Sequence, residues 1–450
     1  MIETLEQLTG SFVGIVWGLP LVFALCFSGV FFTIYFGFPQ LVYFKHATQI
    51  VSGKFEKKDP QPGEISHFQA LCTALSATVG LGNIAGVAIA VALGGPGSVF
   101  WLWVAGFIGM ATKFTEVTLS LKYREVSSSG QVHGGPMFTI KNGLSKKFYP
   151  LAWIYALFVI LSSFGAGNMF QSNQMAQILK SSINIPTWMT GIIFAILASL
   201  VLIGGIKRIG KVTEKLVPMM VGIYVIGALG IILINYSNIL NVFSLIFKGA
   251  FSGTAAVGGF AGVAFKEVVI MGIRRASFSN EAGMGSSAMA HSAAKSLPAQ
   301  EGIVALLEPF IDTIVICSIT ALALLSTGAW SQSGIAGSEL TAWAFENVYG
   351  IWGRAIVALT VTLFAFSTII SWSYYGEQGV AFIFGEKCIT YYRYIFIVFI
   401  FLGAIAKLNL VLNISDAVYG LLAIPNLIGT FLLIGKAKEC LNDYQKNWLS

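Results

Sequence analysis

Two short stretches of this chain combine glycines, hydroxyl side chains and an asparagine within apolar surroundings. The first is ALSATVGLGNIAG, residues 74–86, and the second is RRASFSNEAGMGSS, residues 274–287. An interior glycine destabilises a helix by about 1 kcal/mol relative to alanine, and a buried asparagine needs a hydrogen-bond partner. We therefore expect a helix to break at each stretch and to leave backbone N–H and C=O groups that can bind ions or polar ligands.

The composition is typical of a helical membrane protein. Of the 450 residues, 56% are hydrophobic and 10% are charged, whereas a soluble domain carries about 25% charged residues. The apolar runs do not alternate, as strands of a membrane barrel would over about 10 residues. The net charge of +7 comes from basic residues scattered between these runs. That pattern indicates cytoplasmic loops and does not favour nucleic-acid binding.

The sequence carries no motif that predicts catalysis. It contains no HExxH or GxSxG motif and no paired histidines, and its five cysteines form no CxxC or Cys/His cluster. We therefore do not expect an enzyme, a disulfide or a structural metal site.

Eleven segments are long and apolar enough to cross a bilayer, which takes about 20 residues. The N-terminus is acidic and lacks the basic region of a signal peptide, so we expect the first span to be retained. If the loop after that span is cytoplasmic, 19 of the 27 Lys and Arg residues lie inside and 4 lie outside. The positive-inside rule then predicts an external N-terminus and a cytoplasmic C-terminus. The expected spans are residues 12–37, 66–92, 98–121, 150–179, 189–206, 216–236, 258–297 (interrupted), 299–327, 354–382, 392–408 and 415–435.

The two glycine-rich stretches occupy corresponding positions if spans 2–6 and 7–11 form two sets of five. Because five is odd, the second set has inverted topology, and paired interrupted helices of this kind mark the binding site of secondary transporters. Half-helix N-termini attract carboxylates, and free carbonyls suit a hard cation such as sodium. Close helix packing could explain one glycine-rich stretch, but two at matching positions, both with Asn and hydroxyls, favour a binding site.

Three motifs carry a family resemblance: ALSATVGLGNIAG, GGPGSVFWLWVAGFIG (residues 94–109) and FSNEAGMGSSAMAHSAAK (residues 278–295). They resemble the alanine or glycine:cation symporter family of the amino acid–polyamine–organocation superfamily, with slight departures at Ser98 and Leu102. ATVGLGN is also similar to the broken first core helix of the bacterial leucine and neurotransmitter-type sodium symporters. The resemblance implies one all-α transmembrane domain with a leucine-transporter-like, five-plus-five inverted repeat. Residues 12–37 would be an extra N-terminal helix, 66–236 the first repeat and 258–435 the second.

The resemblance also implies a substrate site and a sodium site at the breaks. The substrate carboxylate would meet the amides of Leu81 and Gly82, and a sodium ion would lie between carbonyls of the first break and hydroxyls of FAFSTIISWSYYG, residues 364–376. With the second break and the cavity walls included, the expected substrate-binding residues are Thr78, Gly80, Leu81, Gly82, Gln171, Phe278, Ser279, Asn280, Ser371 and Trp372. The expected sodium-binding residues are Ser76, Val79, Asn83, Phe364, Ser367 and Thr368, although Asn83 could instead pin the break or bond to another helix.

Charged residues inside spans are usually paired or functional. Lys113 and Glu116 are spaced to pair with each other, and Glu281 is near enough in sequence to pair with Arg274 or Arg275. Glu308 and Asp312 lie one helical turn apart, where they could pair structurally or serve a proton or cation pathway. For His291, helix packing is favoured over a proton relay.

These features predict a symporter of the plasma membrane that moves small neutral amino acids, alanine or glycine, into the cell by alternating access. Sodium would be the co-transported ion, and no cofactor, nucleic acid or oligomer would be needed. A proton-coupled amino acid permease is the alternative, and a channel is less favoured because two internal breaks fit occlusion better than a pore.

Overall fold

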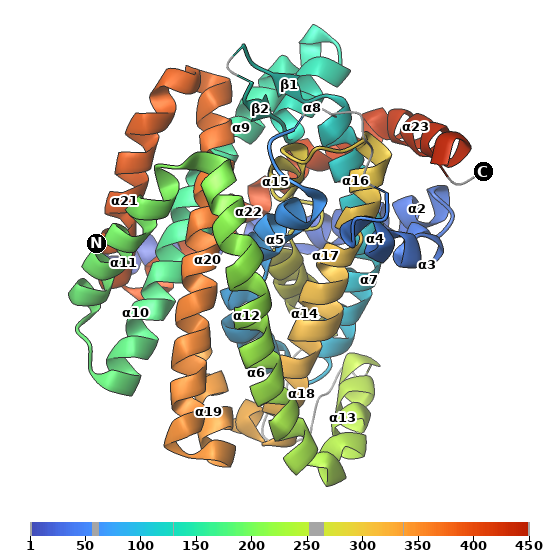
Figure 1. The fold of residues 1–450 in the computed structure, drawn as a ribbon. Coiled ribbons are helices and arrows are strands. Elements are labelled where there is room, and N and C mark those ends of the chain that lie inside the picture. Colours follow the sequence, from blue (N-terminus) through green and yellow to red (C-terminus); the bar gives the residue numbers. More distant parts are fainter. Residues whose placement is uncertain (1, 56–62, 129, 252–264, 336, 449–450) are drawn as a thin grey trace.

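A computed structural model describes residues 2–55, 63–128, 130–251, 265–335 and 337–448 as a bundle of closely packed helices (Figure 1). Eight single helices in these ranges are long and apolar enough to cross a membrane, and one bent pair adds a ninth. The bent pair is His67–Thr78 with Gly82–Gly94, which meet at 47°. The single helices are Thr9–Tyr35, Ser98–Lys122, Lys146–Ile183, Gly205–Ile234, Pro298–Ser326, Ile351–Phe384, Glu386–Ile405 and Val411–Asn447.

Two of the eleven expected spans do not meet this criterion in the described ranges. Thr187–Leu202 is apolar but has 16 residues. The expected span 258–297 begins outside the described residues, and its described part is Phe265–Asn280 followed by the short helix Ala288–Ser292. Four charged residues between positions 265 and 280 lower the hydropathy of that helix. The number eleven therefore stays a prediction.

The first half of the chain contains the first break. The elements are α1 (Ile2–Val16), α2 (Leu19–Tyr35), α3 (Pro39–Val42), α4 (Phe44–Val51), α5 (His67–Thr78), α6 (Val87–Gly94), α7 (Ser98–Lys122), β1 (Glu125–Val126), β2 (Val132–His133), α8 (Pro136–Gly143), α9 (Tyr149–Phe164), α10 (Phe170–Ile183), α11 (Thr187–Leu202) and α12 (Gly205–Ile234). A capping box starts α5, because the Ser66 hydroxyl accepts the Gln69 backbone N–H and the Gln69 side chain accepts the Ser66 backbone N–H.

The second half contains the second break and α20, which at 34 residues is the longest uninterrupted α-helix among the described residues. Its elements are α13 (Ile239–Phe251), α14 (Phe265–Asn280), α15 (Ala288–Ser292), α16 (Pro298–Ala305), α17 (Leu307–Pro309), α18 (Ser318–Ser326), α19 (Ser338–Tyr349), α20 (Ile351–Phe384), α21 (Ile389–Ile405), α22 (Leu408–Leu421) and α23 (Ala423–Trp448). Three π-helical turns, which are frequent at functional sites, occur at Gly82–Gly86, Gly165–Met169 and Phe310–Cys317.

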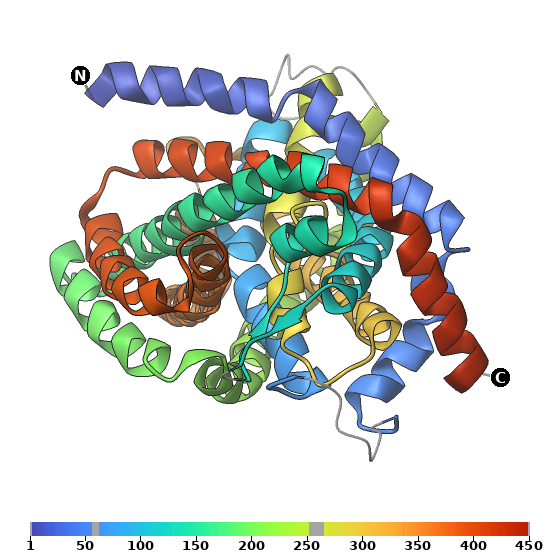
Figure 2. The same cartoon turned by 90° about the horizontal axis from the view of Figure 1, so that it is seen from above.

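The N-terminal helices run along the outside of the bundle. α1 packs against α22, and α2 packs against α7 and α23 (Figure 2). Large apolar side chains remain exposed on the outward faces of the molecule, for example Phe23 on α2 and Ile226 on α12. Such surfaces suit lipid, and they leave the polar breaks at the centre of the bundle. That residues 12–37 are an addition to a repeated core stays a prediction.

The two ends of the bundle carry different elements. The hairpin of β1 and β2 and helix α8 lie at one end, and α13 and α19 lie at the other (Figure 1). At the hairpin end lies a cavity of about 550 Å³, lined by Glu64, residues 130–133 and 204–207, Tyr374, Glu377, Gln378, Glu386, Lys387, Ile389, Thr390 and Arg393. The loops predicted to be cytoplasmic therefore meet at the same end of the bundle.

Candidate functional site

The first break lies between α5 and the π-helical turn Gly82–Gly86. Gly80 cannot continue the α5 hydrogen-bond ladder, because its backbone N–H donates to Asn83 Oδ1 at 2.9 Å. The Asn83 Nδ2 group donates to the side chain of Asp312 at 2.7 Å and to its carbonyl at 3.0 Å. The oxygen and the nitrogen of the Asn83 side-chain amide are thus both engaged in holding the break in place. Pinning the break was one of the two alternatives to sodium binding that the sequence left open for Asn83.

The second break begins where α14 ends at Asn280. Glu281 has φ +60°, and residues 282–287 are not helical before α15 begins. The side chain of Asn280 accepts the Ala282 N–H at 2.9 Å, and Glu116 Oε1 accepts the Gly283 N–H at 3.0 Å. The chain is therefore broken at both predicted stretches, and side chains satisfy the freed amides.

The two breaks are packed directly against each other. A Cβ atom added to Gly82 would lie 2.9 Å from the Cα of Ser279, so only glycine allows this approach. The Ser279 hydroxyl donates to Asp312 Oδ1 at 2.9 Å. Because Asn83 donates to the same oxygen, the buried carboxylate of Asp312 joins one break to the other.

A small cavity opens between the breaks. It leaves about 10 Å³ for the centre of a water molecule, which is room for about one water. Seven of the ten expected substrate-binding residues line it. The lining residues are Ala77, Thr78, Gly80, Leu81, Gly82, Ala166, Gln171, Phe278, Glu281, Trp372 and Tyr419.

Aromatic rings form one wall of this cavity. The ring centroid of Tyr419 lies 5.1 Å from that of Phe278 and 5.8 Å from that of Trp372. The Trp372 indole is held in place by its Nε1, which donates to Glu281 Oε1 at 3.0 Å. A Cβ atom at Gly167 would clash with the Trp372 side chain. The tryptophan therefore has little freedom to move away from a ligand.

Other lining residues bring polar groups. A helix leaves its first backbone N–H groups without helical partners, and here those groups belong to the turn that begins at Leu81 and Gly82. Gln171 donates through Nε2 to the Ala166 carbonyl at 3.0 Å, and its buried Oε1 has no hydrogen-bond partner among the described residues. The lining thus offers amide donors and a carbonyl acceptor beside an aromatic wall, groups that match the two charges of a small zwitterion. A cavity with room for one water must widen before it holds such a molecule.

A cluster of oxygens lies next to the cavity, where α5 meets α20. The Ser76 carbonyl accepts the Thr368 hydroxyl at 3.0 Å and the Ser367 hydroxyl at 3.3 Å. The Ser367 hydroxyl also donates to the Phe364 carbonyl at 2.9 Å. A carbonyl freed by a helix break, a second carbonyl and two hydroxyls form an oxygen donor set of the kind that hard cations prefer.

Three expected substrate-binding residues lie beside the cavity but do not line it. Ser279 faces Asp312, and Asn280 donates through Nδ2 to the Thr313 hydroxyl at 2.9 Å. The Ser371 hydroxyl is buried without a hydrogen-bond partner among the described residues. Val79, expected at the sodium site, is fully buried at the C-terminus of α5, and its N–H donates to the Leu75 carbonyl.

Sequence reasoning missed four lining residues: Ala77, Ala166, Glu281 and Tyr419. Tyr419 carried no signal, because an isolated tyrosine in a membrane span is usual. Glu281 had been assigned an ion pair with Arg274 or Arg275, and that expectation is wrong. Both arginines pair with Asp416 of α22, at 3.0 Å for Arg275.

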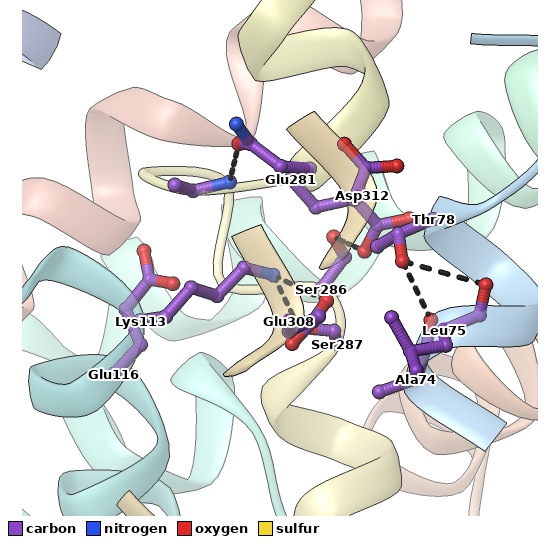
Figure 3. Close-up of polar contacts among 12 residues, drawn as sticks. Ala74, Leu75, Thr78, Lys113, Glu116, Glu281, Ser286, Ser287, Glu308 and Asp312 are labelled. Carbon is purple, nitrogen blue, oxygen red and sulfur yellow. Dashed lines mark hydrogen bonds and ion pairs between the residues drawn. The ribbon is translucent and has the colours of Figure 1, made fainter. Parts of the chain in front are cut away.

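The expected pair of Lys113 and Glu116 is also absent. The Lys113 ammonium pairs with Glu308 at 3.0 Å and contacts the Ser287 hydroxyl (Figure 3). Glu116 instead accepts the amide of Asn426 at 2.5 Å. Better partners come from distant segments, so spacing within one helix did not decide the pairing.

A second group of charged residues links α5, which leads into the first break, to α15, which follows the second break. Glu301 of α16 contacts His67 Nδ1 at 2.6 Å and His291 Nδ1 at 2.8 Å. His67 begins α5, and His291 lies on α15. Next to them, Ile65 forms a parallel bridge with Ala294. His291 thus lies between two buried carboxylates, because its Nε2 is also 3.5 Å from Glu308, and its role in helix packing stays a prediction.

Comparison with known proteins identifies relatives along the whole chain. A family model described as "Sodium:alanine symporter family" matches residues 2–449. "Sodium/alanine symporter AgcS" of Methanococcus maripaludis is 41% identical over 441 residues, which covers 96% of each chain. "Probable sodium/glutamine symporter GlnT" of Bacillus subtilis is 34% identical over 451 residues, or 99% of this chain and 92% of the relative.

Among solved structures, MhsT in complex with L-phenylalanine superposes with a TM-score of 0.61. Its sequence is 15% identical, and the match covers 83% of this chain and 90% of that chain. This likeness concerns the fold alone, and it confirms the predicted leucine-transporter-like architecture.

Proposed function

This chain belongs to the sodium:alanine symporter family, and on that premise we propose that it couples the uptake of small neutral amino acids, alanine and glycine foremost, to the entry of sodium. The family and the membrane-spanning helices make it a secondary transporter and not an enzyme. We place it in the plasma membrane with an external N-terminus, as the distribution of basic residues predicts.

One observation carries the proposal: a single glycine separates the oxygen cluster from the cavity. A Cβ atom at Gly80 would clash with the Thr368 hydroxyl and would lie 3.7 Å from Gln171 Oε1. Thr368 belongs to the oxygen cluster, and Gln171 lines the cavity. A cation and a substrate bound at these places would therefore stabilise the same break, and this is what coupled transport requires.

The cavity supports a small α-amino acid as the substrate. Its carboxylate would meet the amides of Leu81 and Gly82, where the helix dipole favours negative charge. Its ammonium group would approach Gln171 Oε1. A methyl side chain gains only about 0.8 kcal/mol from burial, so selectivity must come from exclusion of larger side chains by Phe278 and Trp372.

Glutamine is the second candidate substrate, because the relative GlnT is named as a probable glutamine symporter. The narrow cavity and the fixed indole of Trp372 favour alanine. Proton coupling is the alternative to sodium coupling.

Uptake into proteoliposomes tests these proposals directly. Labelled alanine, glycine and glutamine are offered in turn, with sodium, potassium or proton gradients imposed separately. We expect alanine to accumulate with a sodium gradient, and a membrane potential that is negative inside should add about 2.3 kcal/mol per 100 mV for each sodium ion that enters. Accumulation of alanine with a proton gradient in sodium-free buffer would overturn the proposal that sodium is the coupled ion. Uptake of glutamine without uptake of alanine or glycine would overturn the proposed substrate assignment.

A further inference from the structure

The geometry points to Glu281 as the charged residue that recognises the ammonium group of the substrate beside Gln171 Oε1, so that the cavity selects α-amino acids over carboxylic acids without an amine. This inference rests on the proposed function, because it assigns a role within the same cavity. Glu281 was not among the residues expected to bind substrate. Three independent observations support the assignment.

The first observation is the backbone of Glu281. Its φ of +60° lies in the left-handed region, at the position after the last residue of α14. Glycine or asparagine normally occupies this position at the end of a helix, because a side chain is strained there. The neighbours Gly283 and Gly285 follow the usual rule, with φ +91° and +73°. A glutamate that keeps such a conformation in a tightly packed core suggests a function for its side chain.

The second observation is an unbalanced buried carboxylate. Glu281 is 1% exposed, and none of the described Lys, Arg or His side chains forms an ion pair with it. The nearby cations have other partners: Lys113 pairs with Glu308, and Arg274 and Arg275 pair with Asp416. A buried carboxylate without a counter-ion is costly. A substrate ammonium would supply the missing positive charge.

The third observation is the place of Glu281 in the cavity. It lines the cavity together with Gln171, whose Oε1 has no partner among the described residues. The amides of Leu81 and Gly82 belong to the other broken helix. The cavity therefore presents donors from one break and a carboxylate from the other. An α-amino acid carries the two matching charges on neighbouring atoms.

A purely structural role for Glu281 is the competing explanation. Its Oε1 accepts the Trp372 indole N–H at 3.0 Å, and its Oε2 accepts the Ser286 hydroxyl at 2.5 Å. Glutamine at this position keeps the size and an oxygen that can accept the indole N–H, but it removes the charge. Glu281→Gln therefore separates recognition of the ammonium group from positioning of the tryptophan.

The test measures sodium-dependent binding of labelled alanine to purified protein, with unlabelled propanoate and valine as competitors. In the wild type we expect propanoate not to compete. Glu281→Gln should weaken alanine binding at least tenfold. The difference in affinity between alanine and propanoate should become smaller, and valine should still fail to compete. Ser286→Ala, which removes one hydrogen bond but keeps the charge, should leave alanine affinity within about twofold. Glu281→Asp retains the charge and tolerates positive φ, so it should bind alanine better than Glu281→Gln.

Unchanged alanine affinity in Glu281→Gln would overturn the inference. So would a variant that admits valine while propanoate stays excluded, because that result assigns Glu281 to positioning Trp372. If neither variant folds, the wild type still decides, because propanoate that competes as well as alanine shows that the ammonium is not recognised. Failure of the proposed function is a separate result: wild-type protein would then show no sodium-dependent alanine binding at all.

Discussion

Thr368→Val is the most direct test of the sodium site. The substitution keeps the volume and branching of the side chain and removes its hydroxyl, which lies 3.0 Å from the Ser76 carbonyl. Thr368 is 1% exposed, so water cannot easily replace the lost oxygen. A hydrogen bond or ligand oxygen facing a charge contributes about 1.5–3 kcal/mol. At about 1.4 kcal/mol per factor of ten, the sodium concentration for half-maximal uptake should rise between roughly tenfold and a hundredfold.

The assay is alanine uptake into proteoliposomes over a range of external sodium. Thr360→Val is the matched control, because Thr360 lies on the same helix and its hydroxyl bonds to Ile356 of its own backbone at 2.9 Å. The control should leave sodium dependence unchanged. At saturating sodium, Thr368→Val should recover most of its alanine affinity. Our reasoning is refuted if sodium dependence stays within twofold of the wild type, or if alanine affinity falls equally at every sodium concentration.

Three further substitutions probe the cavity wall, the first break and the charged cluster. Trp372→Leu should weaken alanine binding and admit valine in a competition assay, whereas Trp153→Leu on the outer face of α9, where the side chain is 49% exposed, should change neither. Asn83→Ala should lower stability by about 2–4 kcal/mol and abolish alanine binding, because it leaves a buried carboxylate and a backbone N–H with fewer partners; wild-type thermal unfolding would contradict this. Glu301→Gln breaks contacts with two buried histidines and should destabilise by about 3–5 kcal/mol, whereas Glu386→Gln, whose carboxylate is 40% exposed beside His133, should shift the unfolding midpoint little.

The breaks were predictable from sequence because their cause is local. Glycines at 80, 82 and 86 weaken a helix wherever it lies, and a nearby asparagine supplies the hydrogen bond that stabilises the interruption. The cavity wall was predictable only in part. Successive residues of a helix point about 100° apart, and on α20 Trp372 lines the cavity whereas Ser371 does not. A family resemblance can therefore locate a helix in the sequence without deciding which face of that helix points into the cavity.

Charge partners were not predictable from spacing. Asp416 is more than 140 positions from the arginines that it binds, and Asn426 is 310 positions from Glu116. In the apolar interior each charge takes the partner that the packing brings nearest, whatever its place in the sequence. Arg274 and Arg275 both pair with the distant Asp416. Neither arginine therefore forms an ion pair with Glu281. The misassigned residue thus became the candidate for substrate recognition.

Coupling between ion and substrate follows, in the proposed mechanism, from the use of one break by both ligands. The C-terminal end of α5 carries the negative end of a helix dipole, and the helix that starts at Gly82 carries a positive end. A cation at Ser76 and Thr368 neutralises the first, and a carboxylate at Leu81 and Gly82 neutralises the second. Each ligand thus offsets part of the electrostatic cost of keeping a broken helix in an apolar interior. By linkage, whichever ligand binds first raises the affinity for the other by the same factor, so a sodium gradient can drive uptake without any direct contact between ion and substrate.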